Sequence, residues 1–185
     1  PMYTTTYGLG QVIKDAINQG CRHFIIGIGG SATNDGGIGM LQALGFELLD
    51  EDGKQVDFGA LGLKQLKIIK TSKVLPVIKE CDFMIACDVN NPLCGPLGSS
   101  YVYGPQKGAN KELIVQMDKW LNEYAILSRE ICPLANMDYP GAGAAGGLGF
   151  AFLTFLNAKL DSGIKLVLQE INFEEEVKDA NLVIT

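Results

Sequence analysis

Two short apolar segments, each running directly into a polar loop, constrain the fold of this chain most strongly. Phe24 to Ile28 and Phe83 to Cys87 have the length and composition of strands that are covered on both faces. The loop after the first reads GGSATNDGG, and the loop after the second reads DVNNPLCGPLGSS. In open α/β sheets, ligands bind in the crevice outside the carboxyl ends of the strands, so both loops are candidate binding segments.

Helical patterns alternate with these strands. Apolar spacing predicts two long amphipathic helices, 8–20 and 111–131, the second with Asn110 as its N-cap. Shorter elements are expected as follows: a helix at 40–44, a hairpin at 46–56, a glycine hinge leading into an apolar helix within 140–160, strands at 164–168 and 182–184, and an acidic helix at 173–179. The expected fold class is α/β, a mostly parallel sheet with helices on both faces and one antiparallel hairpin, with residues 1–185 as a single unit.

Composition excludes several classes of protein. A formal net charge of −6 leaves no basic stripe to neutralise a nucleic-acid backbone. No apolar run approaches the roughly 18 residues of a membrane span. The 5 cysteines are odd in number and form no C-x-x-C pair, so neither a disulfide framework nor a zinc site is indicated. We therefore expect a cytoplasmic protein without nucleic-acid or membrane partners.

Two glycine patterns suggest dinucleotide binding, but neither has the required context. Residues 27–32 match G-x-G-x-x-A after a strand, and 141–146 match G-x-G-x-x-G before a helix. Gly36 and Gly37 would fall inside the helix that the first pattern requires, and no strand precedes the second. An NAD-dependent oxidoreductase therefore remains an alternative hypothesis.

The first loop has the means to hold an anion. Gly29 and Gly30 allow backbone N–H groups to approach a phosphate, while Ser31, Thr33 and Asn34 add side-chain donors. The next residue, Asp35, supplies a carboxylate suited to Mg²⁺. The structural alternative is that Thr33 or Asp35 caps the following helix.

The second loop offers a similar set. Asp88 directly follows its strand and, with Asn90, could ligate magnesium or accept a hydroxyl proton. The alternative is an Asx-turn that orders the loop around Pro92. Lys107 lies between glycine and proline residues, where a lysine suits a transferring phosphoryl group, although it could equally be a surface lysine.

Other chemistries lack their residues. No G-x-x-x-x-G-K-[ST] loop and no G-x-S-x-G elbow is present. His23, the single histidine, precedes an apolar strand segment and is expected to pack at a strand edge. Triad hydrolysis and histidine-ligated metal catalysis are therefore not supported.

Three long motifs, in order, resemble the glycerate kinase family, specifically its bacterial glycerate 2-kinase type. They are GIGGSATNDGGIGMLQALG from Gly27, CDVNNPLCGPLGSSYVYGPQKGA from Cys87 and PGAGAAGGLGFAF from Pro140. The resemblance extends over essentially the whole chain. It implies ATP-dependent phosphorylation of D-glycerate to 2- or 3-phosphoglycerate.

Phosphoryl transfer requires positioned phosphates, Mg²⁺ and charge stabilisation, which these loops can supply. We expect Asp35 and Asp88 as metal-binding or acid–base carboxylates and Lys107 as a phosphate or carboxylate contact. The residues expected to bind ATP are Gly29, Gly30, Ser31, Thr33, Asn34, Asn90, Gly143, Gly146 and Gly147. The last three could present a helix N-terminus to an anion or simply allow close helix packing.

Members of the resembled family are longer, with two α/β domains, one inserted in the other, and a substrate cleft between them. The resemblance therefore implies that 1–185 is an internal fragment, the inserted domain plus adjoining segments, and that it is inactive alone. A homo-oligomer is compatible with these observations. A non-catalytic small-molecule-binding module is the third hypothesis.

Overall fold

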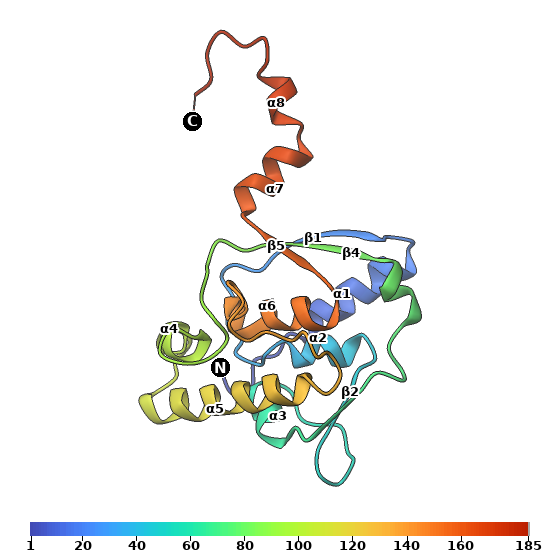
Figure 1. The fold of residues 1–185 in the computed structure, drawn as a ribbon, viewed down its shortest axis with the longest axis vertical. Helices are drawn as coiled ribbons and strands as arrows, with labels where there is room; N and C mark the ends of the chain where they lie inside the picture. Colours follow the sequence, from blue (N-terminus) through green and yellow to red (C-terminus); the bar gives the residue numbers. More distant parts are fainter. Residues whose placement is uncertain (185) are drawn as a thin grey trace.

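A parallel three-stranded sheet organises the chain, whose computed structural model describes residues 1–184 (Figure 1). The strands are β1 (His23–Gly27), β4 (Asp82–Ala86) and β5 (Lys159–Asp161), in the order β1-β4-β5. Both neighbouring pairs are parallel, with Ile26 opposite Ile85 and Ile85 opposite Leu160. The predicted mostly parallel α/β sheet is confirmed. Because the strands run in one direction, their carboxyl ends lie at one edge.

Helices and short 3₁₀ segments connect these strands. The helices are α1 (Tyr7–Asn18), α2 (Ile38–Ala43), α3 (Ala60–Gln65), α4 (Ser99–Tyr103), α5 (Lys111–Ser128), α6 (Ala144–Phe155), α7 (Gly163–Glu170) and α8 (Phe173–Glu176). The 3₁₀ segments are η1 (Pro76–Glu80) and η2 (Pro105–Lys107). The two long predicted helices are confirmed as α1 and α5, and Asn110 Oδ1 accepts the predicted capping bond from Leu113 N at 2.8 Å.

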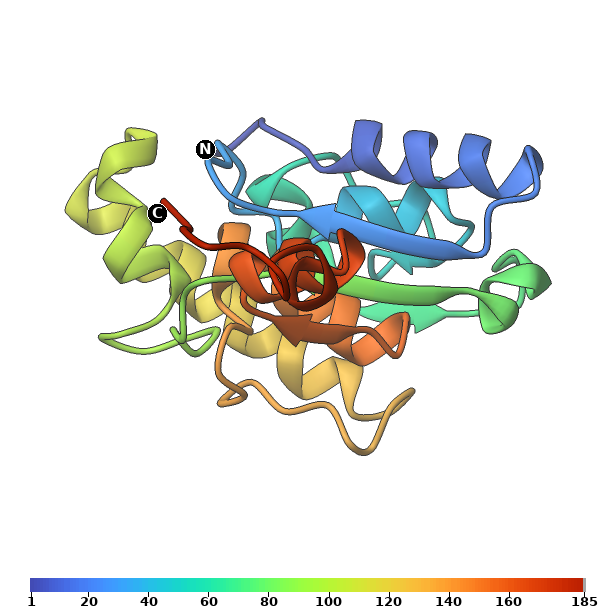
Figure 2. The ribbon, with the colours of Figure 1, turned by 90° about the horizontal axis from the view of Figure 1, so that it is seen from above.

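The sheet is covered unequally on its two sides. On the inner side, Phe83 and Ile85 are buried, and α2 and α6 lie beneath the strands (Figure 1). On the outer side, α7 contacts β4 and α8 extends away from the sheet (Figures 1 and 2), while Ile25 of β1 remains 50% exposed. Helices on both sides were expected, but complete burial of both strand faces was wrong for β1. An apolar run of this length does not say how much of a sheet its helices cover.

The core lies between the sheet and α5. Tyr124 of α5 packs edge-on against Phe150 of α6, with ring centroids 5.4 Å apart. Phe152 of α6 reaches Phe83 of β4 at 6.2 Å. Aromatic contacts thus connect α5 through α6 to the sheet, so the cavity edge of the strands rests on a packed support.

The predicted antiparallel pairing is present, but the strand that begins the predicted hairpin pairs mainly with a later segment of the chain. β2 (Glu47–Leu49) pairs with β3 (Ile68–Lys70), and only one bridge, Leu49 to Gln55, closes the predicted hairpin around Gly53. The sequence of residues 59–80 shows no clear helical or strand periodicity. This segment contains β3, which is too short to produce a periodic pattern and is stabilised by its pairing with β2.

The carboxyl-terminal part differs most from the sequence prediction. The strand expected at 164–168 is helix α7, in which Leu166 is buried whereas Val167 is 54% exposed. The third sheet strand, β5, comes just before it, and 182–184 form no strand. Short apolar runs do not distinguish a strand from a helix, and here the Asp88 cap described below favours the helix. Within 1–184, no helix has both the length and the apolar character needed to cross a membrane.

Candidate active site at the carboxyl edge of the sheet

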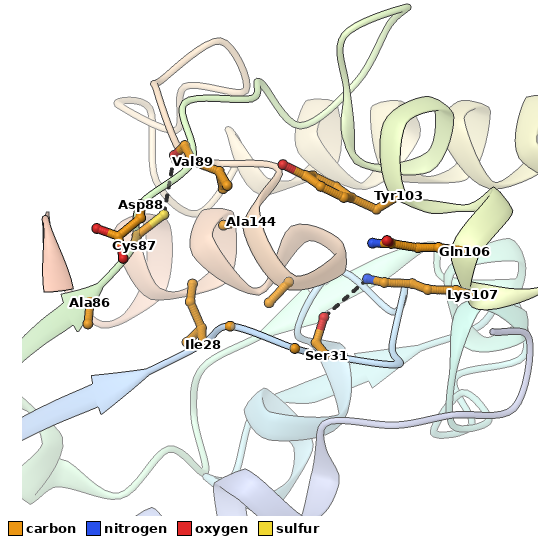
Figure 3. Close-up of a pocket in the computed structure, with 13 residues that line it drawn as sticks. Ile28, Ser31, Ala86, Cys87, Asp88, Val89, Tyr103, Gln106, Lys107 and Ala144 are labelled. Atoms are coloured by element: carbon orange, nitrogen blue, oxygen red, sulfur yellow. Dashed lines mark hydrogen bonds between the residues drawn. The ribbon is translucent and has the colours of Figure 1, made fainter.

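A cavity of about 210 Å³ opens where β1 and β4 end (Figure 3). Both predicted loops contribute to it, together with η2 and the start of α6. Its lining consists of Ile28, Gly29, Gly30, Ser31, Ala86, Cys87, Asp88, Val89, Tyr103, Gln106, Lys107, Ala144 and Ala145. Five of the predicted site residues, Gly29, Gly30, Ser31, Asp88 and Lys107, therefore meet around one space.

The first loop presents bare backbone to this cavity. A Cβ atom added at Gly29 or Gly30 would meet no atom within 4 Å, and Gly30 has a φ of +69°. Thr4 Oγ1 holds the loop from behind by donating a hydrogen bond to the Ala32 carbonyl oxygen at 2.9 Å. The absence of side chains leaves room for a ligand to approach the main chain, as a phosphate or carboxylate site requires.

Lys107, the last residue of η2, is held against the first loop by hydrogen bonds. Its Nζ donates to the Thr33 carbonyl oxygen at 2.6 Å and to Ser31 Oγ at 3.1 Å. Burial lowers the pKa of the Lys107 amine to about 8, although the negative charge of Asp35 acts in the opposite direction. A partly desolvated ammonium group is a strong anchor for an anion, because little water competes with the ligand.

Asp88 lies at the other end of the cavity from Lys107 (Figure 3). Its Oδ1 accepts hydrogen bonds from Ser162 Oγ at 3.0 Å and from Gly163 N at 2.9 Å, and so caps the start of α7. Within the described chain, no hydrogen bond reaches Oδ2 of Asp88. The carboxylate thus has one structural oxygen and one oxygen available to a ligand.

Asp35 lies outside the cavity lining and is fully buried. Its Oδ2 accepts hydrogen bonds from Thr6 N at 2.8 Å and Thr6 Oγ1 at 2.9 Å, and its Oδ1 accepts one from Gly37 N at 3.1 Å. Burial raises the pKa of this carboxyl group, while the hydrogen bonds from Thr6 and Gly37 partly counteract that rise. Asp35 therefore binds Thr6 and Gly37, the N-cap residues of α1 and α2, which is a structural role close to the capping alternative considered for it, and it lies outside the cavity lining.

Asn34 and Thr33 also lie outside the cavity lining. Asn34 is buried, donates to Ser100 Oγ at 3.0 Å and accepts from Ser99 Oγ at 3.3 Å. Thr33 contributes its carbonyl oxygen to Lys107. These residues tie the first loop to the start of α4 and to η2, which carry the second motif.

The glycines of the third motif allow close backbone packing. A Cβ atom at Gly146 would collide with the Thr33 carbonyl oxygen, and one at Gly143 with the Pro92 carbonyl oxygen. Gly147 lies similarly close to the Cα of Gly36. The close-packing alternative thus accounts for these residues, while Ala144 and Ala145 form the part of this segment that lines the cavity.

Sequence reasoning missed Tyr103, Gln106 and the two alanines. Tyr103 OH donates to Asn91 Oδ1 at 2.6 Å, which directs the ring across the upper rim of the cavity (Figure 3). Gln106 and Lys107 follow Tyr103 by three and four residues, a spacing that places side chains on one face of a helix. This spacing could have associated Tyr103 and Gln106 with Lys107 from the sequence alone. The alanines carry no such signal.

His23 lies at the opposite end of the sheet from the cavity, and its side chain is largely exposed instead of packed as expected. It begins β1, and its exposed Nδ1 is 2.9 Å from Asp82 Oδ2. The cavity forms at the other end of the same two strands.

Comparisons with known proteins agree with this architecture. The sequence model of the Glycerate kinase family matches residues 1–185. The chain is 50% identical to a glycerate kinase of Halalkalibacterium halodurans and 48% identical to glycerate 2-kinase of Escherichia coli, in each case over 100% of this chain and 49% of the relative. A crystal structure from Salmonella typhimurium LT2, provisionally described as glycerate kinase 2, superposes with a TM-score of 0.96 at 45% identity, covering 100% of this chain and 50% of that one.

The chain thus spans about half the length of the curated relatives it matches. The match is continuous, and it includes all three motifs and every residue that lines the cavity. The chain belongs to the glycerate kinase family.

Proposed function

We propose that the full-length protein containing this chain is a kinase that transfers the terminal phosphoryl group of ATP to D-glycerate. The observation that carries the proposal is the cavity at the sheet edge, which brings a bare glycine loop, a partly buried ammonium group and a carboxylate into one space. Phosphoryl transfer depends mainly on positioning and electrostatic stabilisation, and these groups supply both. Membership of a kinase family implies a nucleotide substrate, and the name of the Escherichia coli relative supports glycerate as the acceptor.

The residues that line the cavity could bind Mg²⁺ together with the phosphates of a nucleotide, but they do not form a complete metal site by themselves. The described residues contain no group of three or more His, Cys, Asp or Glu side chains arranged to hold a metal ion. Mg²⁺ is usually bound through one or two carboxylates together with substrate phosphates, and the free Oδ2 of Asp88 meets that smaller requirement. Asp88 and the neighbouring Asn90 would hold the ion, which when bound would neutralise the charge on the phosphate oxygens.

The remaining roles belong to the protein's own groups. Lys107 and Ser31 bind and orient an anionic group at one end of the cavity. Asp35 and Thr6 hold the first loop in the conformation that exposes Gly29 and Gly30, without touching the substrate. In this proposal Asp35 is a positioning residue, and Asp88 and Lys107 are the groups that contact the reactants.

The structural context argues against the oxidoreductase alternative. In a dinucleotide fold the glycine loop turns directly into a helix whose N-terminus receives the pyrophosphate. Here α2 begins at Ile38, and Gly36 and Gly37 precede it with φ of +62° and +79°. At the second pattern, backbone from Pro92 and Thr33 occupies the space that a pyrophosphate would need.

ADP release by the full-length protein tests the proposal. We expect release that depends on D-glycerate, ATP and Mg²⁺, with no comparable rate when glycerate is omitted. Turnover no higher than in that control would overturn it and favour the non-catalytic binding module. Product analysis by NMR would then distinguish 2-phosphoglycerate from 3-phosphoglycerate. The two-domain architecture and any homo-oligomer stay predictions.

A further inference from the structure

A second cavity opens beside the first along the same edge of the sheet. It measures about 540 Å³ and is lined by the loop that follows β4, by the end of β5 and by the segment before α6, including Asn90, Tyr139, Leu160, Asp161 and Ser162. Cys87, Asp88 and Val89 line both cavities. Asp88 therefore belongs to the wall that the two spaces share.

The smaller cavity is chemically suited to a short hydroxy acid. Its cationic end is formed by Lys107 with Ser31, and its other end is formed by Asp88, whose Oδ2 can accept a hydrogen bond (Figure 3). A hydroxy acid has the matching arrangement, with a carboxylate at one end and hydroxyl groups at the other. At about 210 Å³ the cavity is below the roughly 300–1,000 Å³ typical of sites for larger ligands.

The larger cavity is suited to a nucleotide. Its volume falls within the usual range for ligand sites, and Tyr139 offers a ring that is 42% exposed beside Pro140 and Leu160. Aromatic rings of this kind stack on nucleobases. Asn90 and Ser162 add hydrogen-bonding groups for a sugar or phosphate. Among the described residues, no lysine or arginine lines this cavity, and its charged groups are the carboxylates of Asp88 and Asp161. A phosphate chain would therefore bind here as its Mg²⁺ complex, with the ion beside Asp88.

We propose that the two cavities are separate subsites, the smaller for glycerate, with its carboxylate at Lys107, and the larger for the nucleotide, with its terminal phosphate beside Asp88. This assignment rests on the proposed kinase function and adds the orientation of both substrates. It places the acceptor hydroxyl and the transferred group next to each other beside Asp88, where the two cavities adjoin.

The reaction balances in this arrangement. A hydroxyl oxygen of glycerate forms a bond to the γ-phosphorus of ATP, and the bond from that phosphorus to the β,γ-bridging oxygen breaks. ADP departs with the electron pair, and the hydroxyl proton leaves to water. Lys107 continues to bind the glycerate carboxylate, which takes no part in bond making.

The test is to measure the binding of each substrate separately to the full-length protein by titration calorimetry. Lys107→Met is expected to weaken D-glycerate binding about tenfold or more, while binding of ATP with Mg²⁺ changes less than about twofold. Tyr139→Ala is expected to weaken ATP binding about fivefold or more and to leave glycerate binding nearly unchanged. Ser31→Ala keeps the lysine and should weaken glycerate binding about threefold, again with little effect on ATP binding.

Matched controls are available on the same surface. Lys111→Met removes an exposed lysine at the start of α5, and Tyr101→Ala removes a tyrosine that is 40% exposed and lines neither cavity. Both controls should bind the two substrates as the unmodified protein does. The opposite pattern, with Lys107→Met weakening ATP alone or Tyr139→Ala weakening glycerate alone, would overturn the assignment of subsites. An unmodified protein that binds neither substrate would instead overturn the proposed function.

Discussion

The side-chain nitrogen of Lys107 lies 3.1 Å from the hydroxyl oxygen of Ser31, at one end of the cavity that forms where two parallel strands end. The same nitrogen donates to the Thr33 carbonyl oxygen at 2.6 Å. These two bonds hold the ammonium group in place and leave one of its three N–H donors for a ligand. Because the group is partly desolvated, its charge state becomes sensitive to pH near neutrality.

The pH dependence of catalysis should report Lys107. Its pKa lies near 8 instead of the ordinary 10.5, so the anion-binding ammonium form is half-populated near pH 8, nearly complete about one pH unit lower, and lost as pH rises further. In the full-length protein, kcat/KM for glycerate should be flat below about pH 7 and fall as pH rises through about 8. The profile is measured by ADP release. An identical fall in Lys107→Met, at its lower overall rate, would assign the titration to another group.

Asp88→Asn should lower kcat by about 100-fold or more, because Asp88 lines both cavities and the substitution removes its negative charge. Asp82→Asn, at the exposed opposite end of the same strand, is the control and should change kcat by less than about twofold. Thermal unfolding separates the catalytic loss from loss of the α7 cap. If Asp88→Asn retained the original kcat, Asp88 would not contact the reactants.

Thr6→Val should destabilise the protein by about 1–3 kcal/mol. The Thr6 hydroxyl donates to Asp35 at 2.9 Å and accepts from Met40 N at 2.9 Å, and valine removes both bonds at nearly unchanged volume. Chemical denaturation measures the loss. The control is Thr71→Val on an exposed loop, which should lie within about 0.5 kcal/mol of the original. Equal effects of the two substitutions would exclude a structural role for the Asp35–Thr6 pair.

Gly146→Ala tests the close packing of the third motif against the first loop. The substitution combines a φ of +72° with a collision against the Thr33 carbonyl oxygen. Gly20→Ala has a φ of +98° and open space around the added Cβ, so it measures backbone strain alone, about 1–2 kcal/mol. Gly146→Ala should cost clearly more than Gly20→Ala in chemical denaturation. Similar costs would mean that the loop shifts freely to admit a methyl group.

Tyr103 offers a substitution that separates its hydroxyl from its ring. Tyr103→Phe removes the 2.6 Å bond to Asn91 and should lower the free energy of unfolding by about 1 kcal/mol, with the cavity wall intact. Tyr103→Ala removes the wall itself and should raise KM for glycerate by about tenfold relative to Tyr103→Phe. Steady-state kinetics of the two variants give this ratio. A ratio near one would remove the ring from the substrate site.

Sequence reasoning succeeded where the signal is local. The 3.6-residue apolar period identified α1 and α5, and Asn110 was identified as the α5 cap from its chemistry and position. The two strand–loop junctions led directly to Gly29, Ser31 and Asp88 as residues of one edge. These inferences needed only the neighbours of each residue along the chain.

Where two segments distant in sequence had to meet, the sequence was ambiguous. The sequence suggested Asp35 as a metal-binding or acid–base carboxylate because it follows the donors of an anion-binding loop. In the structure its carboxylate lies at the starts of two helices that are distant from each other in sequence. The pairing of β2 with β3 and the helical state of 164–168 depend on contacts with distant segments as well. Burial of a side chain is a property of the packed chain, so its polar partners and its pKa follow only from that packing.

The sequence by itself thus determined the α/β class, the edge of the sheet that carries the site and the family to which the chain belongs. Those features are encoded in hydrophobic period, turn chemistry and ordered motifs, all of which are local in the chain. Only the tertiary structure decided that Lys107 reaches Ser31 across 76 residues, that Asp35 is buried away from the cavity, and that Asp88 is shared by two adjoining cavities. Each of these depends on how distant segments pack, which is governed by the burial of apolar surface and by the requirement that buried polar groups find partners.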